Sequence, residues 1–214
     1  MQALLVDART RQPLETPYLV RMPGWTLERY LEEAPESAFW EFVRGEVIMH
    51  SPVRVEHQRL VVWLTVLLRA YSHRRGLEYE VLTGPAAVQI LPDVVREPDV
   101  FLLAPEDAAR VQGVPIRARP QLVVEVVSPS TRTLDKVEKA HDYALAGIPE
   151  YWVVDPDLKE VLFHTLEGPR YRVQRLTQGR LESRVLSGFW LEVSWLFQQP
   201  LPSEWKVLAR LLES

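Results

Sequence analysis

The run LVVEVV at residues 122–127 constrains the fold of this chain more than any other stretch. Its β-branched and apolar residues predict a strand that is covered on both faces. Side chains alternate along a strand, so Val123, Glu125 and Val127 share one face, and the Glu125 carboxylate lies in or beside the core. An unpaired carboxylate there would cost several kcal/mol. Glu125 therefore needs a cation, an arginine or lysine partner, or a raised pKa.

Helices and strands are predicted on both sides of this run. Helical periodicity covers residues 26–33, with Thr26 as N-cap, and residues 55–73. A third helix follows residue 127, where Asp135 and Glu138 match a capping box and Gly147 marks the end. Strands are predicted as a hairpin over 39–49 that turns at Arg44-Gly45, and over 79–82, 86–90, 99–103, 151–154, 161–166 and 171–176. These elements predict an α+β fold, α/β/α-like in its layers, with a mixed β-sheet core flanked by helices.

Composition narrows the class of protein. The chain of 214 residues is long enough for one domain with a substantial core. Its longest apolar run, near residues 60–68, is shorter than the roughly 20 residues that span a bilayer, and residues 1–13 make a poor signal peptide, so we expect a cytoplasmic protein without a membrane span. The absence of cysteine excludes disulfides and thiolate metal sites. The chain has 17 prolines and no asparagine, a thermolabile residue, and both features suggest a thermophilic source.

The charge balance is acidic, with a net charge of −4. A domain that binds DNA mainly through the positive electrostatic potential of its surface is usually basic. This net charge therefore counts against a domain that only binds DNA. It does not count against an enzyme whose acidic site holds a cation.

Asp99 and Glu125 form the most informative pair of carboxylates. Asp99 opens the apolar stretch 100–103 after Glu97-Pro98, and Glu125 lies in a second strand. Carboxylates on neighbouring strands repel unless a cation lies between them, and an all-oxygen ligand set favours Mg²⁺ or Mn²⁺ over zinc. The structural alternatives are a strand-capping role for Asp99 and an arginine partner for a buried Glu125.

The helix after the Glu125 strand carries two of the four lysines of the chain. Lys139 has Lys136 three residues before it and Tyr143 four residues after it, so the three are expected near one helix face. A lysine directed at a metal site can stabilise an attacking hydroxide or a developing phosphoryl charge. Solvated lysines on an exposed face are the alternative.

Two further residues are candidates for a supporting role. Glu46 follows the turn at Gly45, and His57 begins the long helix; either could help to hold a metal or activate water, and a capping or surface role is the alternative for His57. The histidines show no zinc spacing, and Ser128-Pro129-Ser130 lacks the surroundings of a nucleophile elbow. No glycine-rich phosphate loop is present.

Several of these segments together resemble a known family. Glu97-Pro98-Asp99-Val100, the run LVVEVVSPSTRTLDKVEKAHDYALAGIPEYWVVDP at residues 122–156, and the upstream segments WTLERYLEEAPE, FVRGEVIMHSP and VEHQRLVVWL resemble the Uma-type endonuclease family of the PD-(D/E)XK nuclease superfamily. The resemblance covers roughly residues 24–198 and is most specific over residues 125–156. It implies a restriction-endonuclease-like fold.

The resemblance also implies roles for individual residues. Asp99, Glu125 and Lys139 would be catalytic, with Asp99, Glu125 and Glu46 as ligands of Mg²⁺ or Mn²⁺ and with Tyr143 and His57 in support. The superfamily has a lysine two residues after its second acidic residue; Val127 stands there, and Lys139 in the next helix would take its place. Arg132 and Lys136 would contact nucleic acid.

The implied activity is hydrolysis of DNA phosphodiester bonds, with DNA as substrate and a homodimer as the form that cuts both strands. The alternative is a catalytically inactive nuclease fold that serves as a binding or regulatory module, and a third option is a metal-dependent hydrolase of another phosphorylated substrate. The expected domain organisation is an N-terminal arm over residues 1–23, a nuclease domain over 24–198, and a C-terminal helix over 199–214 that packs on the same domain through residues such as Leu208 and Trp205.

Overall fold

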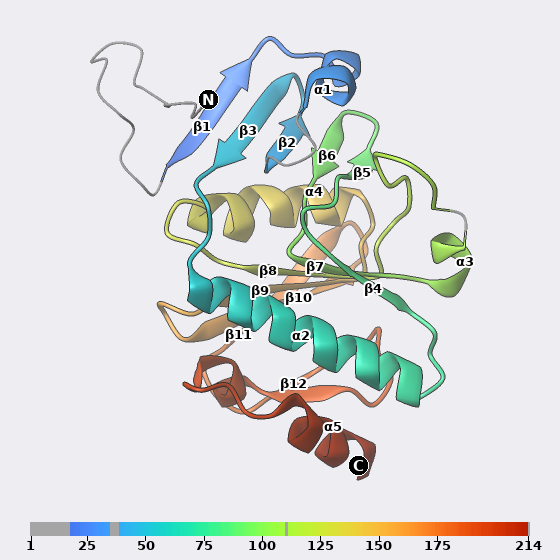
Figure 1. Ribbon diagram of the computed structural model, residues 1–214, viewed down its shortest axis with the longest axis vertical. Helices are drawn as coiled ribbons and strands as arrows, with labels where there is room; N and C mark the ends of the chain where they lie inside the picture. The colour runs from blue at the N-terminus through green and yellow to red at the C-terminus, as the bar shows by residue number, and fades with distance from the viewer. Residues whose placement is uncertain (1–17, 35–38, 110, 214) are drawn as a thin grey trace.

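The computed structural model describes residues 18–34, 39–109 and 111–213, so residues 1–17, the first part of the expected arm, lie outside the described residues. Figure 1 shows the elements stacked in layers, with the two sheets lying on either side of α4. The α-helices in the described part are α1 (Leu27–Glu33), α2 (Val55–Arg74), α3 (Pro105–Ala108), α4 (Ala140–Leu145) and α5 (Glu204–Glu213). A π-helical segment, η1 (Leu134–Lys139), runs directly into α4, and a 3-10 segment, η2 (Val193–Phe197), precedes α5.

The central sheet has six strands in the order β11-β10-β9-β8-β7-β4. Its β8 and β9 are parallel and the other pairs are antiparallel, which makes the sheet mixed. Its strands are β4 (Glu80–Thr83), β7 (Val100–Leu103), β8 (Leu122–Val126), β9 (Glu150–Asp155), β10 (Glu160–Glu167) and β11 (Arg170–Leu176). All five residues of β8 are buried, as expected of a strand covered on both faces.

A second, antiparallel sheet lies above α4 in the view of Figure 1, in the order β1-β3-β2-β6-β5. Its strands are β1 (Leu19–Pro23), β2 (Trp40–Val43), β3 (Glu46–His50), β5 (Val88–Leu91) and β6 (Val94–Arg96). The short pair β12 (Arg180–Glu182) and β13 (Trp190–Glu192) completes the strands of the described residues. The chain passes between the two large sheets after β4 and again between β6 and β7.

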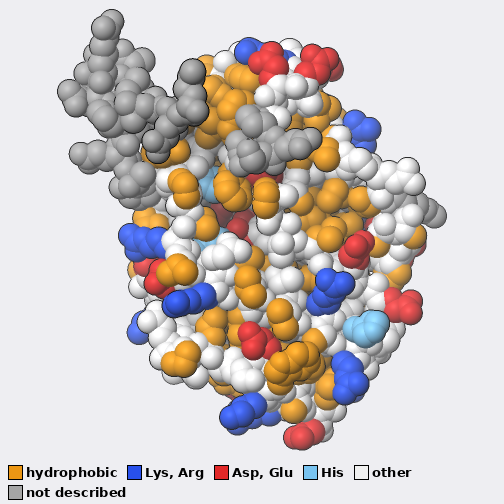
Figure 2. All heavy atoms as spheres, viewed as in Figure 1, with side chains coloured by type: hydrophobic (Ala, Val, Ile, Leu, Met, Phe, Trp, Pro, Cys, Tyr) orange, Lys and Arg blue, Asp and Glu red, His pale blue; other side chains and the backbone are white. Residues whose placement is uncertain are grey.

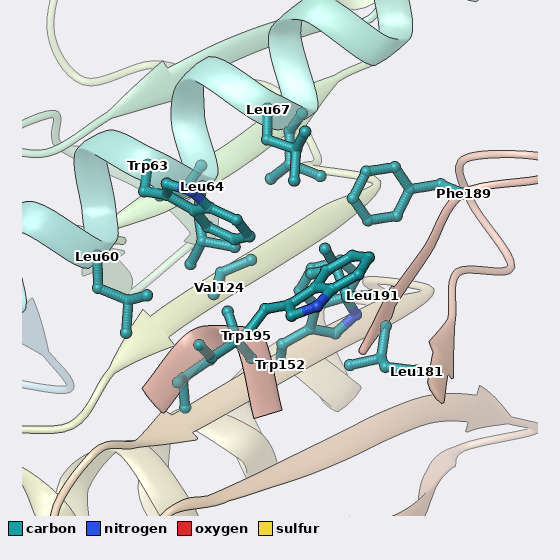
Figure 3. Packing of buried hydrophobic residues seen from close by; sticks show 14 of the residues in the cluster. Leu60, Trp63, Leu64, Leu67, Val124, Trp152, Leu181, Phe189, Leu191 and Trp195 are labelled. Carbon is teal, nitrogen blue, oxygen red and sulfur yellow. The ribbon is translucent and has the colours of Figure 1, made fainter. Parts of the chain in front are cut away.

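The largest apolar core lies between α2 and the central sheet. The α2 side chains Leu60, Trp63, Leu64 and Leu67 point towards Val124 of β8, with Trp152 and Trp195 beneath them (Figure 3). A smaller core lies on the opposite face of the sheet, where Tyr143 of α4 packs with Phe101 and Val123. The sheet is therefore covered on both faces.

The structure confirms the predicted α+β class with a mixed sheet flanked by helices. Thr26 caps α1 by accepting a hydrogen bond from the Arg29 amide at 3.2 Å. The proposed capping box at residues 135–138 is wrong: η1 has Thr133 at its N-cap without a side-chain cap, and the Asp135 side chain contacts Lys139 instead. Strands β1, β6, β12 and β13 were not predicted, because each is short or weakly periodic.

At the C-terminal end, α5 packs on α2, with Leu208 and Leu211 buried in the main core. Trp205 differs from the expectation because it is 68% exposed on the outer side of α5. None of the helices in the described ranges is both long enough and apolar enough to cross a membrane.

Candidate active site

Asp99 directly precedes β7, and Glu125 lies in β8, the neighbouring strand of the central sheet. In the antiparallel pair of β7 and β8, Val100 is opposite Val124 and Phe101 is opposite Val123. Extending this register by one position puts Asp99 opposite Glu125. Glu125 shares the strand face of Val123, which carries η1 and α4, whereas Asp99 stands at the end of β7, where its carboxylate contacts His57 of α2.

The two carboxylates line one cavity of about 270 Å³. Figure 2 shows acidic side chains at the bottom of a hollow, with histidine side chains beside them. The polar and charged residues of the lining come from both sheets, from α2 and from the η1 region: His50, His57, Gln58, Glu97, Asp99, Glu125, Ser128, Thr131, Asp135 and Lys139. The cavity therefore lies where the chain crosses between the two sheets.

Lys139 is the central cation of this cluster. Its Nζ lies 2.8 Å from Glu125 Oε1, 3.1 Å from Glu41 Oε1 and 3.3 Å from Asp135 Oδ1. Burial lowers the pKa of Lys139, but the charges of Glu125, Glu41 and Asp135 outweigh burial and raise it well above its ordinary value. Lys139 is therefore a buried ammonium that stays charged.

Glu125 accepts a second hydrogen bond, from the Tyr143 hydroxyl to Oε1 at 2.8 Å. Burial raises the pKa of Glu125, Lys139 lowers it, and the nearby carboxylates, Asp99 first among them, raise it again, so that the pKa lies well above its ordinary value. Negative charge is therefore in excess around this carboxylate.

Asp99 is fixed by two donors. His57 Nε2 lies 3.1 Å from Asp99 Oδ2, and the Val126 amide donates to the same oxygen at 2.7 Å. Burial raises the pKa of Asp99, but the hydrogen bond and charge of His57, together with Lys139 and this amide, lower it on balance. Asp99 is thus held as a carboxylate beside the cavity.

Glu41 of β2 joins the cluster from the second sheet. Its Oε2 accepts a hydrogen bond from Arg96 at 2.7 Å, and its Oε1 accepts one from the Glu97 amide at 3.1 Å. Arg96 also donates to Asp142 Oδ2 at 2.5 Å. The glutamate, the arginine and Asp142 are all buried, so this network fixes the second sheet to the helical layer.

The donor chemistry of the cavity fits a divalent cation. Four carboxylates line it, those of Glu97, Asp99, Glu125 and Asp135, whereas Lys139 is the one lysine or arginine in the described lining. Glu97 Oε2 is buried without a hydrogen-bond partner, and burial, followed by the charge of Glu41, raises the pKa of Glu97 to about 8. Excess carboxylate oxygens of this kind suit Mg²⁺ or Mn²⁺. Within the described ranges, however, no three such side chains are already arranged to hold a metal ion.

The structure brings five of the expected residues together, namely Asp99, Glu125, Lys139, Tyr143 and His57. Glu46 does not line the cavity; its carboxylate pairs with Arg21 at 3.3 Å and is 39% exposed. It shares a face of the β2–β3 hairpin with Glu41 but lies at the turn, where Arg21 links it to η1 through Glu138.

Arg132 and Lys136 also lie outside the lining. Lys136 Nζ pairs with Asp155 at 2.6 Å and with Glu160 at 2.8 Å, and Arg132 pairs with Asp155 and Asp157. Lys136 thus does not share a face with Lys139 and Tyr143, because the wider turn of η1 directs it towards the ends of β9 and β10.

Sequence reasoning missed Glu41 and the cavity position of Glu97. Glu41 lies within FWEFV and is a charged residue inside an apolar strand, the same signal that identified Glu125. Glu97 stands two residues before Asp99, and no pattern in the sequence indicates that its carboxylate lines a cavity.

Comparisons with known proteins support this fold. A family model described as "Uma2: Putative restriction endonuclease" matches residues 27–194. The chain is also similar to a crystal structure of a putative nuclease belonging to DUF820 from Anabaena variabilis, with a TM-score of 0.70 and 15% sequence identity, over 81% of this chain and 97% of that chain. At this identity the likeness shows the fold. No curated protein sequence matches the chain.

The matched range includes the central sheet, the strands of the second sheet other than β1, α2 and every residue of the cavity lining. This protein therefore belongs to the Uma2 family of putative restriction endonucleases.

Proposed function

We propose that this protein is a metal-dependent endonuclease that hydrolyses phosphodiester bonds in DNA. The observation that carries the proposal is the placement of Asp99 and Glu125 together in the lining of one acidic cavity, with the Lys139 ammonium beside Glu125. Family membership supports the reaction class, and the excess of carboxylates supports a divalent cation as cofactor.

Asp99 and Glu125 would hold the Mg²⁺ or Mn²⁺. The chemistry supplied by such a cation is activation of water and neutralisation of charge on the phosphate. Protein residues hold the two carboxylates in position: His57 and the Val126 amide bind Asp99, and Tyr143 binds Glu125. Lys139 lines the cavity as a permanent cation, so it can orient the attacking water and stabilise negative charge on the phosphoryl oxygens.

The alternative function is a binding or regulatory module that keeps the fold without the activity. The absence, among the described residues, of three metal donors already in place favours this alternative. The acidic net charge of the whole chain also favours it.

Plasmid cleavage distinguishes the two functions. We expect the wild type to nick supercoiled DNA with Mg²⁺ or Mn²⁺ and not with a chelator. The isosteric variants Asp99→Asn and Glu125→Gln should each lose about 100-fold or more of the rate, as is common when one group that stabilises a transition state is removed. The control is Glu192→Gln, which breaks a surface ion pair with Arg180 and should cleave like the wild type.

Cleavage that continues at the wild-type rate in both site variants would show that the activity arises elsewhere. A folded wild type that binds Mn²⁺ without cutting plasmid, single-stranded DNA or RNA would favour the binding module.

A further inference from the structure

The Lys139 ammonium is held by carboxylates from three layers of the molecule. Glu125 comes from the central sheet, Glu41 from the second sheet and Asp135 from the π-helical segment of Lys139 itself. The contact with Glu125 is the shortest of the three, at 2.8 Å. The position of Lys139 therefore depends on a carboxylate that the proposed function also assigns to a divalent cation.

A shared Glu125 creates a conflict between two cations. Two positive charges that face one carboxylate repel each other, and the ammonium would be pushed out of the cavity unless other anions hold it. Glu41 and Asp135 are the described carboxylates that contact Lys139 apart from Glu125. One of them must keep the ammonium in place when Glu125 binds metal.

Glu41 is the better anchor on three grounds. Its contact with Lys139, at 3.1 Å, is shorter than that of Asp135, at 3.3 Å. Arg96 and the Glu97 amide bind its carboxylate, so it cannot swing away with the lysine. It does not line the cavity, so it does not compete for the metal.

The ionisation states of Glu41 and Asp135 also favour Glu41 as the anchor of Lys139. Burial raises the pKa of Glu41, but Lys139 and Arg96 lower it to about 2, so Glu41 is an anion at neutral pH. Burial raises the pKa of Asp135, and the opposing effects of Lys139 and Thr131 do not cancel the rise. Asp135 is therefore the weaker counter-ion for the lysine.

We propose that Glu41 is a positioning residue that holds the Lys139 ammonium at the cavity when a divalent cation occupies Glu125. The inference rests on the proposed function for the role of Lys139 towards phosphate, but the hold of Glu41 on Lys139 is measurable without any substrate. Glu41 acts through Lys139 and touches neither metal nor substrate.

The first test is spectroscopic and uses the protein without substrate, both free of metal and saturated with Mg²⁺. The chain has only four lysines, so NMR of lysine labelled at Nζ can resolve the Lys139 ammonium, with Lys139→Arg to assign the signal. We expect slow proton exchange of this signal in the wild type. Glu41→Gln should speed the exchange by about tenfold or more, because the neutral amide is a weaker acceptor for a charged donor. The control Glu33→Gln removes an exposed carboxylate that pairs with Arg29 and should leave the signal unchanged.

The second test is kinetic and separates positioning from metal binding. In Glu41→Gln we expect kcat to fall by about tenfold or more, with KM and the Mn²⁺ affinity within about twofold of the wild type. Glu125→Gln should instead lose Mn²⁺ affinity. A Lys139 signal or a kcat that is the same in Glu41→Gln and in the wild type would overturn the proposal, and so would a loss of Mn²⁺ affinity.

Two safeguards keep the tests separate. If Glu41→Gln does not fold, Glu41→Asp replaces it; this variant keeps the charge that Arg96 needs but withdraws the carboxylate from Lys139. Slow exchange that persists in Glu41→Asp would then overturn the proposal. If the wild type cuts no DNA, the proposed function fails, while the metal-free NMR comparison still decides whether Glu41 holds Lys139.

Discussion

At the scale of single residues, burial forces charged groups to share partners. Lys139 contacts three carboxylates, and Arg96 binds both Glu41 and Asp142, so each of these two cations is in contact with more than one opposite charge. A buried ion that loses its partner is costly because neither water nor another charge replaces the contact. The same condition links the proposed chemistry of this site to the stability of the fold.

The pH dependence of stability should reveal the charge of Glu41. Burial raises its pKa, but Lys139 and Arg96 lower it from 4.5 to about 2, so between these values the folded protein binds fewer protons at Glu41 than the unfolded chain. The ionised carboxylate therefore stabilises the fold fully above about pH 5, and this stabilisation is lost as the pH falls towards 2. A shift of this size corresponds to about 3 kcal/mol.

We expect Glu41→Gln to be about 3 kcal/mol less stable than the wild type at pH 7 in urea unfolding, with the difference shrinking as the pH falls below 4. Glu33→Gln, which removes an exposed carboxylate, should show no such convergence. A difference between wild type and Glu41→Gln that stays constant from pH 7 to pH 3 would contradict the assigned ionisation.

At the scale of elements, α2 and the η1–α4 segment cover opposite faces of the central sheet. One face of α2 packs on the main core and contains Leu60, Leu64 and Leu67, while Val62 on the other face is 50% exposed. The η1–α4 segment carries fewer apolar residues and more charges, because it covers the face that contains the cavity. One face of the sheet thus carries the main apolar core, and the other carries charged residues of the cavity.

Two neighbouring positions of α2 test this division of the helix surface. Leu64 is fully buried in the main core (Figure 3), so we expect Leu64→Ala to cost about 2–5 kcal/mol of unfolding free energy through the cavity it leaves. Val62→Ala removes an exposed side chain and should change stability by less than about 0.5 kcal/mol. Equal losses of unfolding free energy in the two variants, measured by urea unfolding, would contradict the placement of Leu64 on the buried face of α2 and Val62 on the exposed face.

At the scale of the whole molecule, the cavity exists because two sheets meet. The crossing at residues 84–87 leads from β4 to β5, and the crossing at 97–99 leads from β6 to β7. Gly84, Glu97 and Asp99 of these crossings all line the cavity, and Lys139 joins Glu125 of one sheet to Glu41 of the other. The site is therefore a property of the assembled layers.

The C-terminal segment closes the molecule on the side opposite the second sheet (Figure 1). Val207, Leu208 and Leu211 of α5 are buried in the main core, and Trp63 donates a hydrogen bond to the Pro202 carbonyl at 2.7 Å. We propose that residues 199–214 are part of the same cooperative unit as the rest of the fold.

Removing residues 199–214 should therefore lower the unfolding free energy by several kcal/mol, at about 1.5–3 kcal/mol for each buried aliphatic side chain lost. Trp205→Ala, which truncates an exposed side chain of the same helix, should stay within about 0.5 kcal/mol of the wild type. A shortened chain that unfolds at the same urea concentration as the full chain would show that α5 is a separate appendage.

The sequence by itself determined the fold class and the centre of the candidate site. Strand alternation and helical periodicity are local properties, so they identified α2, β8 and the β2–β3 hairpin, and they predicted the position of Glu125 in or beside the core, where the structure buries it. Asp99 was recognisable at the head of a second strand, and Lys139 in the helix that follows β8. Asp99, Glu125 and Lys139 lie close together because β7 and β8 are both consecutive strands and neighbours in the sheet, and because η1 follows β8 in the chain.

Only the tertiary structure decided which other charges join the site. Glu41 and Glu46 share one face of the same hairpin, and periodicity cannot rank them; the packing of that sheet on η1 places Glu41 at Lys139 and Glu46 at Arg21. The contact between Glu41 and Lys139 joins residues 98 positions apart. Such pairings depend on how whole layers pack, and a pattern of period two or 3.6 carries no information about that packing.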